Sequence, residues 1–228
     1  MCKLKSAIIL KDRVFIPDYD SHTDMLSELG IKDTRANAER LFVRAELSPE
    51  NNDIFSPVDT WKFKVDQDIR PEWFVEEYEK QRMIEAVKAW AKEHIHIGVT
   101  GLKISSGSNH YIKDCKDVEI YGSATVKYIY GSATVENICD SATVEYIYGS
   151  ATVEYIYDSA TVKNIYGSAT VKNICGSATV ISSKYTEWKN KDKFILSGNA
   201  TFKDNIGKVI YQAGDWEFRL VNNEKAGE

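Results

Sequence analysis

Residues 121–183 read YGSATVKYI, YGSATVENI, CDSATVEYI, YGSATVEYI, YDSATVKNI, YGSATVKNI and CGSATVISS, and this stretch decides the fold. The motif Ser-Ala-Thr-Val begins at Ser123 and recurs every nine residues until Ser177, so the segment is an array of seven near-identical phrases. Short repeats stack into regular scaffolds in which each unit contacts mainly its neighbours. Such a scaffold has long uniform surfaces that suit binding, whereas catalysis needs unlike residues gathered at one point.

The phrase, numbered from Tyr121 as position 1, has apolar Ala, Val and Ile at positions 4, 6 and 9. Ala and Val alternate as they would on a short strand with one face in a core. A bend near positions 7 and 8 lets Ile point inward too, and Gly or Asp at position 2 supplies a second bend. The array therefore predicts a parallel β-solenoid.

The length of one coil follows from the space that a core needs, and the charges at position 7 agree with it. Nine residues are too few to enclose a core, so we predict two phrases, about 18 residues, per coil with a rise of about 4.8 Å. This register makes opposite charges vertical neighbours in the pairs Lys127/Glu145, Glu145/Lys163 and Glu154/Lys172, and like charges only in Glu136/Glu154. With nine residues per coil, like pairs outnumber opposite ones, which stacked strands disfavour.

The same register predicts which outward side chains stack. One column contains Tyr130, Tyr148 and Tyr166, and another contains Tyr121, Cys139, Tyr157 and Cys175. Tyrosine offers a large contact area at low entropy cost, so these five tyrosines are the candidate binding residues. The alternative is a stacking ladder that only stabilises the coils.

Residues 1–98 have mixed patterns that predict an α+β head domain. Apolar runs at 7–10 and 14–16 predict two strands of a hairpin. Residues 71–93 predict the longest helix, because apolar side chains recur on one helical face and acidic residues fill the first turn. From His94 onward, polar and apolar residues alternate as they do in a strand. We therefore place the domain boundary in this segment, after residue 98.

The solenoid is predicted to occupy residues 99–204 and a C-terminal cap residues 205–228. Apolar segments at 209–211 and 216–221 flank the turn-forming Ala213-Gly214-Asp215. This pattern predicts a β-hairpin that covers the last coil, as the end of a solenoid requires.

Few residues suggest catalysis or metal binding. His94 and His96 lie on one face if their segment is a strand, and His22 follows Asp18 and Asp20, so a metal or acid–base site can be drawn from them. Solvated histidines beside an acidic loop explain the same pattern more simply. The motifs GxGxxG, GxxxxGK[ST], HExxH and GxSxG do not occur, nor does the Gly-Gly-x-Gly-x-Asp loop of calcium-binding rolls. We expect no enzyme activity, no metal and no cofactor.

The composition limits the classes of partner that the protein can bind. The 228 residues include 29 Lys and Arg against 34 Asp and Glu, and this charge of -5 without a basic block argues against a nucleic-acid partner. No run of about 20 apolar residues predicts a membrane span, and the apolar stretch at the N-terminus is too short for a secretion signal. We therefore expect a cytoplasmic protein without a membrane partner. The four cysteines show no zinc-ligand spacing and are expected to be thiols.

Residues 1–22, MCKLKSAIILKDRVFIPDYDSH, and residues 72–99, EWFVEEYEKQRMIEAVKAWAKEHIHIGV, resemble proteins encoded by bacteriophages and prophages of gut-type bacteria. In that family a similar head domain precedes a variable number of short ATV-type repeats, and no activity is established for the family. The resemblance implies a phage-type accessory protein inside the host cell. Together with the tyrosine columns, it leads us to expect a non-enzymatic protein that binds a host or defence protein, as an inhibitor. The alternative is a structural solenoid that self-assembles into a dimer or filament.

Overall fold

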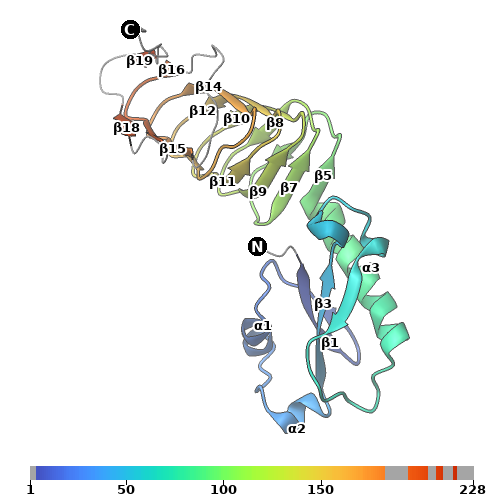
Figure 1. The fold of residues 1–228 in the computed structure, drawn as a ribbon. Coiled ribbons are helices and arrows are strands. Elements are labelled where there is room, and N and C mark those ends of the chain that lie inside the picture. The colour runs from blue at the N-terminus through green and yellow to red at the C-terminus, as the bar shows by residue number, and fades with distance from the viewer. Residues whose placement is uncertain (1–3, 183–194, 205–208, 213–217, 220–228) are drawn as a thin grey trace, which may run out of the picture. The chain divides into compact units, whose positions relative to one another are not determined.

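The computed structural model describes residues 4–182, 195–204, 209–212 and 218–219. The chain divides into two compact units, Met1–His94 and Ile95–Glu228 (Figure 1). The first solenoid strand, β5 (Ile95–Ile97), pairs in parallel with β7 (His110–Lys113), so the solenoid begins at residue 95 and not after residue 98.

An antiparallel sheet in the order β2-β1-β3-β4 forms the centre of the first unit. The strands are β1 (Lys5–Leu10), β2 (Val14–Phe15), β3 (Phe42–Ser48) and β4 (Lys62–Val65). The helices are α1 (His22–Glu28), α2 (Arg35–Ala38) and α3 (Glu76–His94), with short turns η1 (Glu50–Asn52) and η2 (Val58–Thr60). Both α1 and α3 contact β1, and all six residues of β1 are buried. The predicted hairpin is confirmed, because Ile8 on β1 pairs with Phe15 on β2.

The longest helix begins at Glu76, later than the predicted start at residue 71. Pro71 instead opens a turn in which the Phe74 N–H donates to the Pro71 carbonyl oxygen at 3.0 Å. The indole N–H of Trp73 donates to the Arg40 carbonyl oxygen at 2.8 Å, which ties this turn to the segment before β3. A long-range contact therefore fixes the turn that helical periodicity alone would have continued.

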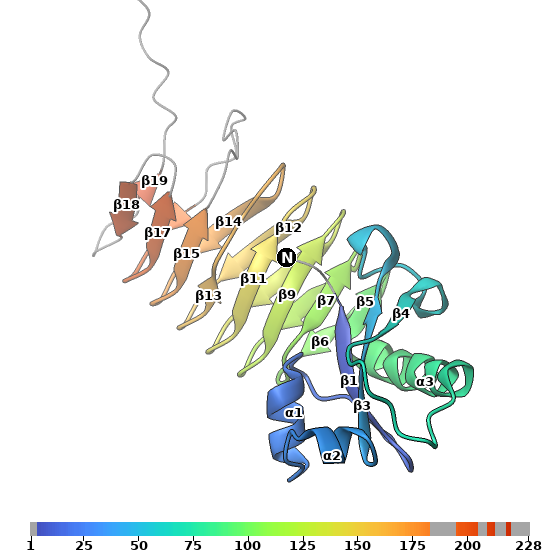
Figure 2. The same cartoon turned by 60° about the horizontal axis from the view of Figure 1, so that its bottom comes forward.

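The second unit is a β-solenoid with two sheets (Figure 2). We call the sheet with eight described strands the long sheet and the one with seven the short sheet. The strand order is β5-β7-β9-β11-β13-β15-β17-β18 in the long sheet and β6-β8-β10-β12-β14-β16-β19 in the short sheet. The remaining long-sheet strands are β9 (Thr125–Tyr130), β11 (Thr143–Ile147), β13 (Thr161–Val162), β15 (Thr179–Ser182), β17 (Thr201–Asp204) and β18 (Val209–Gln212). The short-sheet strands are β6 (Lys103–Ile104), β8 (Val118–Ile120), β10 (Thr134–Ile138), β12 (Thr152–Ile156), β14 (Thr170–Ile174), β16 (Ile195–Leu196) and β19 (Phe218–Arg219).

The predicted coil of about 18 residues is confirmed by the strand register. Thr134 pairs with Thr152, which in turn pairs with Thr170. In these ladders the paired residues pass from position 6 directly to position 8, so the position 7 residue stands outside the pairing. This gap in the pairing falls at the predicted bend, and the bend explains why Val at position 6 and Ile at position 9 both face inward.

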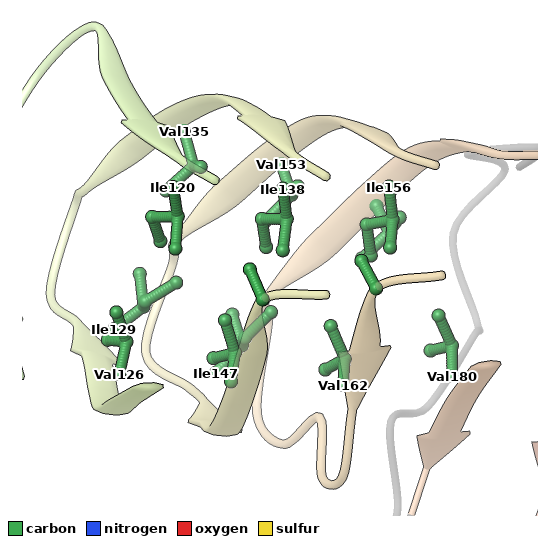
Figure 3. Close-up of a cluster of buried hydrophobic side chains, with 14 of the residues drawn as sticks. Ile120, Val126, Ile129, Val135, Ile138, Ile147, Val153, Ile156, Val162 and Val180 are labelled. Carbon is green, nitrogen blue, oxygen red and sulfur yellow. The ribbon is translucent and has the colours of Figure 1, made fainter. Parts of the chain in front are cut away.

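The solenoid core consists of the repeated Ala, Val and Ile side chains. From Ala124 to Val180 these residues are at most 4% exposed. Figure 3 shows Val and Ile from the two sheets facing one another across the interior. Each coil therefore contributes the same small apolar set, which is the expected consequence of the phrase.

The C-terminal strands differ from the predicted hairpin. Strand β18 pairs antiparallel with β17, and β19 pairs antiparallel with β16, so the two strands lie in different sheets. Each parallel ladder ends in an edge with unpaired N–H and C=O groups, and each edge receives one antiparallel strand. Residues 205–208, 213–217 and 220–228 of the predicted cap lie outside the described residues.

Candidate protein-binding surface

Two rows of tyrosine run across the strands of the long sheet and its adjoining corner. We define the tyrosine strip as Tyr111, Tyr128 and Tyr146 in one row and Tyr130, Tyr148 and Tyr166 in the other. The strand register creates both rows, because Tyr111 pairs with Tyr128, and Tyr128 with Tyr146, in successive parallel ladders. All six residues are half-buried.

Rings contact their neighbours along each row. The ring centroids of Tyr111 and Tyr128 are 5.6 Å apart, and those of Tyr128 and Tyr146 are 5.3 Å apart, both in stacked geometry. In the second row, Tyr130 and Tyr148 have centroids 4.7 Å apart at a tilt of 43°. These separations fall in the range in which aromatic pairs attract beyond simple burial.

The two rows also contact each other. Tyr128 meets Tyr148 edge to face at 5.6 Å and 85°, and Tyr146 stacks on Tyr166 at 6.2 Å and 14°. Burial raises the pKa of the Tyr128 hydroxyl, and the neighbouring Tyr146 and Glu145 add to this effect. The strip is therefore one interlocked aromatic surface and not two independent columns.

A ladder of charges borders the strip. Glu145 lies 4.0 Å from Lys127 on one side and 4.0 Å from Lys163 on the other. The third pair, Lys172 with Glu154, is on the short sheet and is not part of this border. All three opposite-charge pairs predicted from the 18-residue register are thus present. The ammonium of Lys113 lies 5.7 Å from the ring centroid of Tyr130, a cation–π contact at the start of the second row.

The other predicted column does not join the strip. Tyr121 and Tyr157 follow strands of the short sheet, and the 18-residue register places Cys139 between them. A hydrogen bond with the Cys139 thiol, assisted by burial, raises the pKa of Tyr157 to about 12. Cys115, Cys139 and Cys175 are free thiols, as predicted, since Cys139 and Cys175 are 36 positions, or two coils, apart. Cys2 lies outside the described residues.

Sequence reasoning missed half of the strip. Tyr111, Tyr128 and Tyr146 were not among the predicted binding residues, although Tyr128 and Tyr146 occupy position 8 of alternate phrases. The predicted coil length already makes those two residues vertical neighbours. Tyr111 precedes the repeat array, so only the ladder between β7 and β9 reveals its place.

The histidines and aspartates considered for a chemical site are separated. His94 Nε2 lies 3.0 Å from an Asp18 carboxylate oxygen, whereas Asp20 pairs with the ammonium of Lys5 at 3.2 Å. His22 Nδ1 lies 3.6 Å from Asp66. His96 is on β5 and stacks on His110 with ring centroids 5.7 Å apart.

Comparison of the chain with known protein families, curated proteins and solved structures finds no match. Within the described residues, no helix combines the length and the apolar character needed to cross a membrane.

Proposed function

We propose that this chain is a non-enzymatic binding protein whose solenoid presents the tyrosine strip to a host or defence protein and thereby inhibits it. The observation that carries this proposal is the interlocking of six half-buried tyrosines into one surface on the repeat scaffold. The choice of a host or defence protein as partner rests on the resemblance to phage-encoded proteins.

The packing of the strip favours binding for an energetic reason. A side chain that must be ordered on binding costs about 0.5–1.5 kcal/mol of entropy. The stacked and edge-to-face contacts already restrict these rings in the free protein, so that cost is reduced. Rigid tyrosines that keep part of their surface exposed are typical anchors of protein interfaces.

The charges beside the strip favour an acidic partner surface. Lys113 lies over the ring of Tyr130, and Lys127 and Lys163 lie on either side of Glu145, the residue before Tyr146, so lysines outnumber acids in this group. Complementary charge speeds association and sets orientation more than it raises affinity. Binding should therefore weaken in high salt, mainly through a slower association rate.

The proposal is tested by substitutions that the repeat itself already contains. Position 8 is Tyr in some phrases and Asn in others, so Tyr128→Asn and Tyr146→Asn should preserve the solenoid while breaking the strip. Tyr155→Asn is the matched control, because Tyr155 is 48% exposed on the short sheet, between Asn137 and Asn173 in the ladder.

We expect wild-type protein and Tyr155→Asn to retain the same discrete host protein from lysate, quantified by mass spectrometry, and the Tyr128→Asn/Tyr146→Asn double variant to lose it. Retention by all three proteins would show that the strip is only a stabilising ladder. Self-association that is unchanged by lysate, measured by light scattering, would instead support the structural alternative.

A further inference from the structure

The first unit contains a cluster of three metal-ligating side chains that is remote in sequence from the tyrosine strip. His22 is the first residue of α1, Glu46 lies on β3, and Asp66 directly follows β4. One ligand atom from each residue lies within 4.8 Å of the others. The sequence pattern did not predict this cluster, because it groups His22 with the nearby Asp18 and Asp20. In the structure, Asp18 pairs with His94 and Asp20 pairs with Lys5.

The hydrogen bond of His22 fixes which ring nitrogen faces the carboxylates. Its Nε2 lies 3.3 Å from the Ala45 carbonyl oxygen, and because a carbonyl can only accept, Nε2 carries the hydrogen. In the neutral ring, the lone pair on Nδ1 then faces the Asp66 carboxylate at 3.6 Å. Two electron-rich groups in this arrangement attract a metal cation between them. A metal-bound histidine usually donates its other N–H to a backbone carbonyl or a carboxylate in this way.

A cation of the protein already lies against the two carboxylates. The ammonium of Lys64 is 3.1 Å from Asp66 and 3.8 Å from Glu46, and Lys64 pairs with Glu46 across the β3–β4 ladder. The hydrogen bond to Asp66 raises the pKa of Lys64. The Lys64 side chain is 64% exposed, whereas that of His22 is 11% exposed, so the lysine can move into solvent while the histidine stays in place.

We propose that His22, Glu46 and Asp66 form a binding site for a divalent transition metal of the Zn²⁺ class, which displaces the Lys64 ammonium. Imidazole nitrogen suits Zn²⁺ better than it suits Ca²⁺ or Mg²⁺, and carboxylate oxygens complete a common zinc ligand set. Tetrahedral ligands at about 2.0–2.1 Å from zinc are about 3.4 Å apart, close to the present separation of His22 and Asp66. Rotation of the longer Glu46 side chain brings in the third ligand.

The test is calorimetric titration of the full-length protein with zinc chloride after treatment with a chelator. We expect one Zn²⁺ site per chain that raises the thermal midpoint, with no comparable binding of Ca²⁺. His22→Gln and Asp66→Asn should each weaken binding at least about tenfold. Lys64→Gln should tighten binding, because the competing ammonium is gone, and a merely structural ion-pair network would not show that gain.

A second group of potential ligands provides the control. Cys139, Asp140 and Asp158 also place their ligand atoms within 4.8 Å of one another, but Asp140 and Asp158 already accept backbone N–H groups of Gly122 and Asp140 at 2.8 and 3.3 Å. Asp158→Gly introduces the residue found at this position in other phrases and should leave zinc binding unchanged. The proposal is overturned by an absence of saturable zinc binding, by a loss of binding in Asp158→Gly, or by weaker binding in Lys64→Gln.

Discussion

Position 2 of the phrase guides the chain from one sheet to the other. The φ angles there are positive, for example 63° at Gly122, 73° at Gly131 and 56° at Asp140. Glycine adopts this left-handed region freely, and aspartate tolerates it better than most residues. The Asp140 carboxylate also accepts the backbone N–H of Gly122 from the adjacent coil at 2.8 Å, a hydrogen bond that glycine at this position cannot supply.

Gly122 is the position where glycine matters most among these turns. A Cβ atom there would lie 2.3 Å from the Ser105 carbonyl oxygen, a backbone atom that cannot move aside alone. Gly122→Ala therefore adds this overlap to the left-handed strain of about 1–2 kcal/mol. We expect it to lower the free energy of unfolding, measured by urea denaturation, by at least about 2 kcal/mol.

Gly101→Ala separates the two contributions. Gly101 has a similar φ of 72°, but a Cβ atom there meets nothing within 4 Å. This variant should lose only the strain energy. Equal destabilisation by both substitutions would mean that the approach of adjacent coils contributes nothing at Gly122.

At the scale of the strand, position 8 has two alternative uses. In the long-sheet row it holds Tyr128 and Tyr146, which stack, and then Asn164. The Asn164 amide donates to the Glu145 carbonyl oxygen at 3.1 Å, and that of Asn173 donates to the Glu154 carbonyl oxygen at 3.1 Å. Both acceptors are carbonyls of position 7 residues, which stand outside the pairing of the ladders.

Removing one such amide should destabilise the solenoid measurably. Asn173→Ala removes this hydrogen bond to the part-buried Glu154 carbonyl, at a cost of about 1 kcal/mol. A loss of that size lowers the thermal midpoint by about 2–4 °C for a chain of this length. Calorimetry of the full-length protein would measure the shift.

Asn137→Ala is the comparison for the same side-chain truncation. Asn137 also occupies position 8, but the described residues contain no corresponding hydrogen bond from its amide. Its substitution should shift the midpoint less than Asn173→Ala does. The reverse order would exclude the hydrogen bond to the Glu154 carbonyl as the source of the stabilisation.

Elements with local or periodic signals could be predicted from the sequence, and pairings between distant segments could not. The number of residues needed to enclose a core predicted the coil length, with support from the charges at position 7, and the Ala, Val and Ile positions predicted the core. The partners of β18 and β19 were missed because an apolar segment indicates a strand but not which edge it joins. His22 was missed as a partner of Glu46 and Asp66 for the same reason, since neither lies within 20 residues of it.

At the scale of the whole molecule, the two halves of a coil are equivalent in the core. One phrase forms a long-sheet strand and the next forms a short-sheet strand, yet both bury Ala, Val and Ile at the same positions. In repeat architectures of this kind, stability is approximately a sum over units and their interfaces. The solenoid should therefore tolerate the loss of half a coil, with every later strand moving to the other sheet.

Deletion of residues 145–153 tests this equivalence. It joins Val144 to Glu154 and restores an intact phrase, CDSATVEYI. After the deletion, Glu154 takes the place of Glu145 and lies between Lys127 and Lys172 in the vertical row at position 7. Glu136 becomes the neighbour of Lys163, so all these pairs have opposite charges.

Deletion of residues 145–152 is the control, since it keeps an extra Val153 within the strand, and a one-residue slip turns side chains to the wrong face. Circular dichroism during urea denaturation should show a cooperative β transition for the nine-residue deletion and a lower midpoint for the eight-residue deletion, although the latter chain is longer. A higher midpoint for the eight-residue deletion would mean that the two half-coils are not interchangeable and that sheet identity is fixed by residues outside the core.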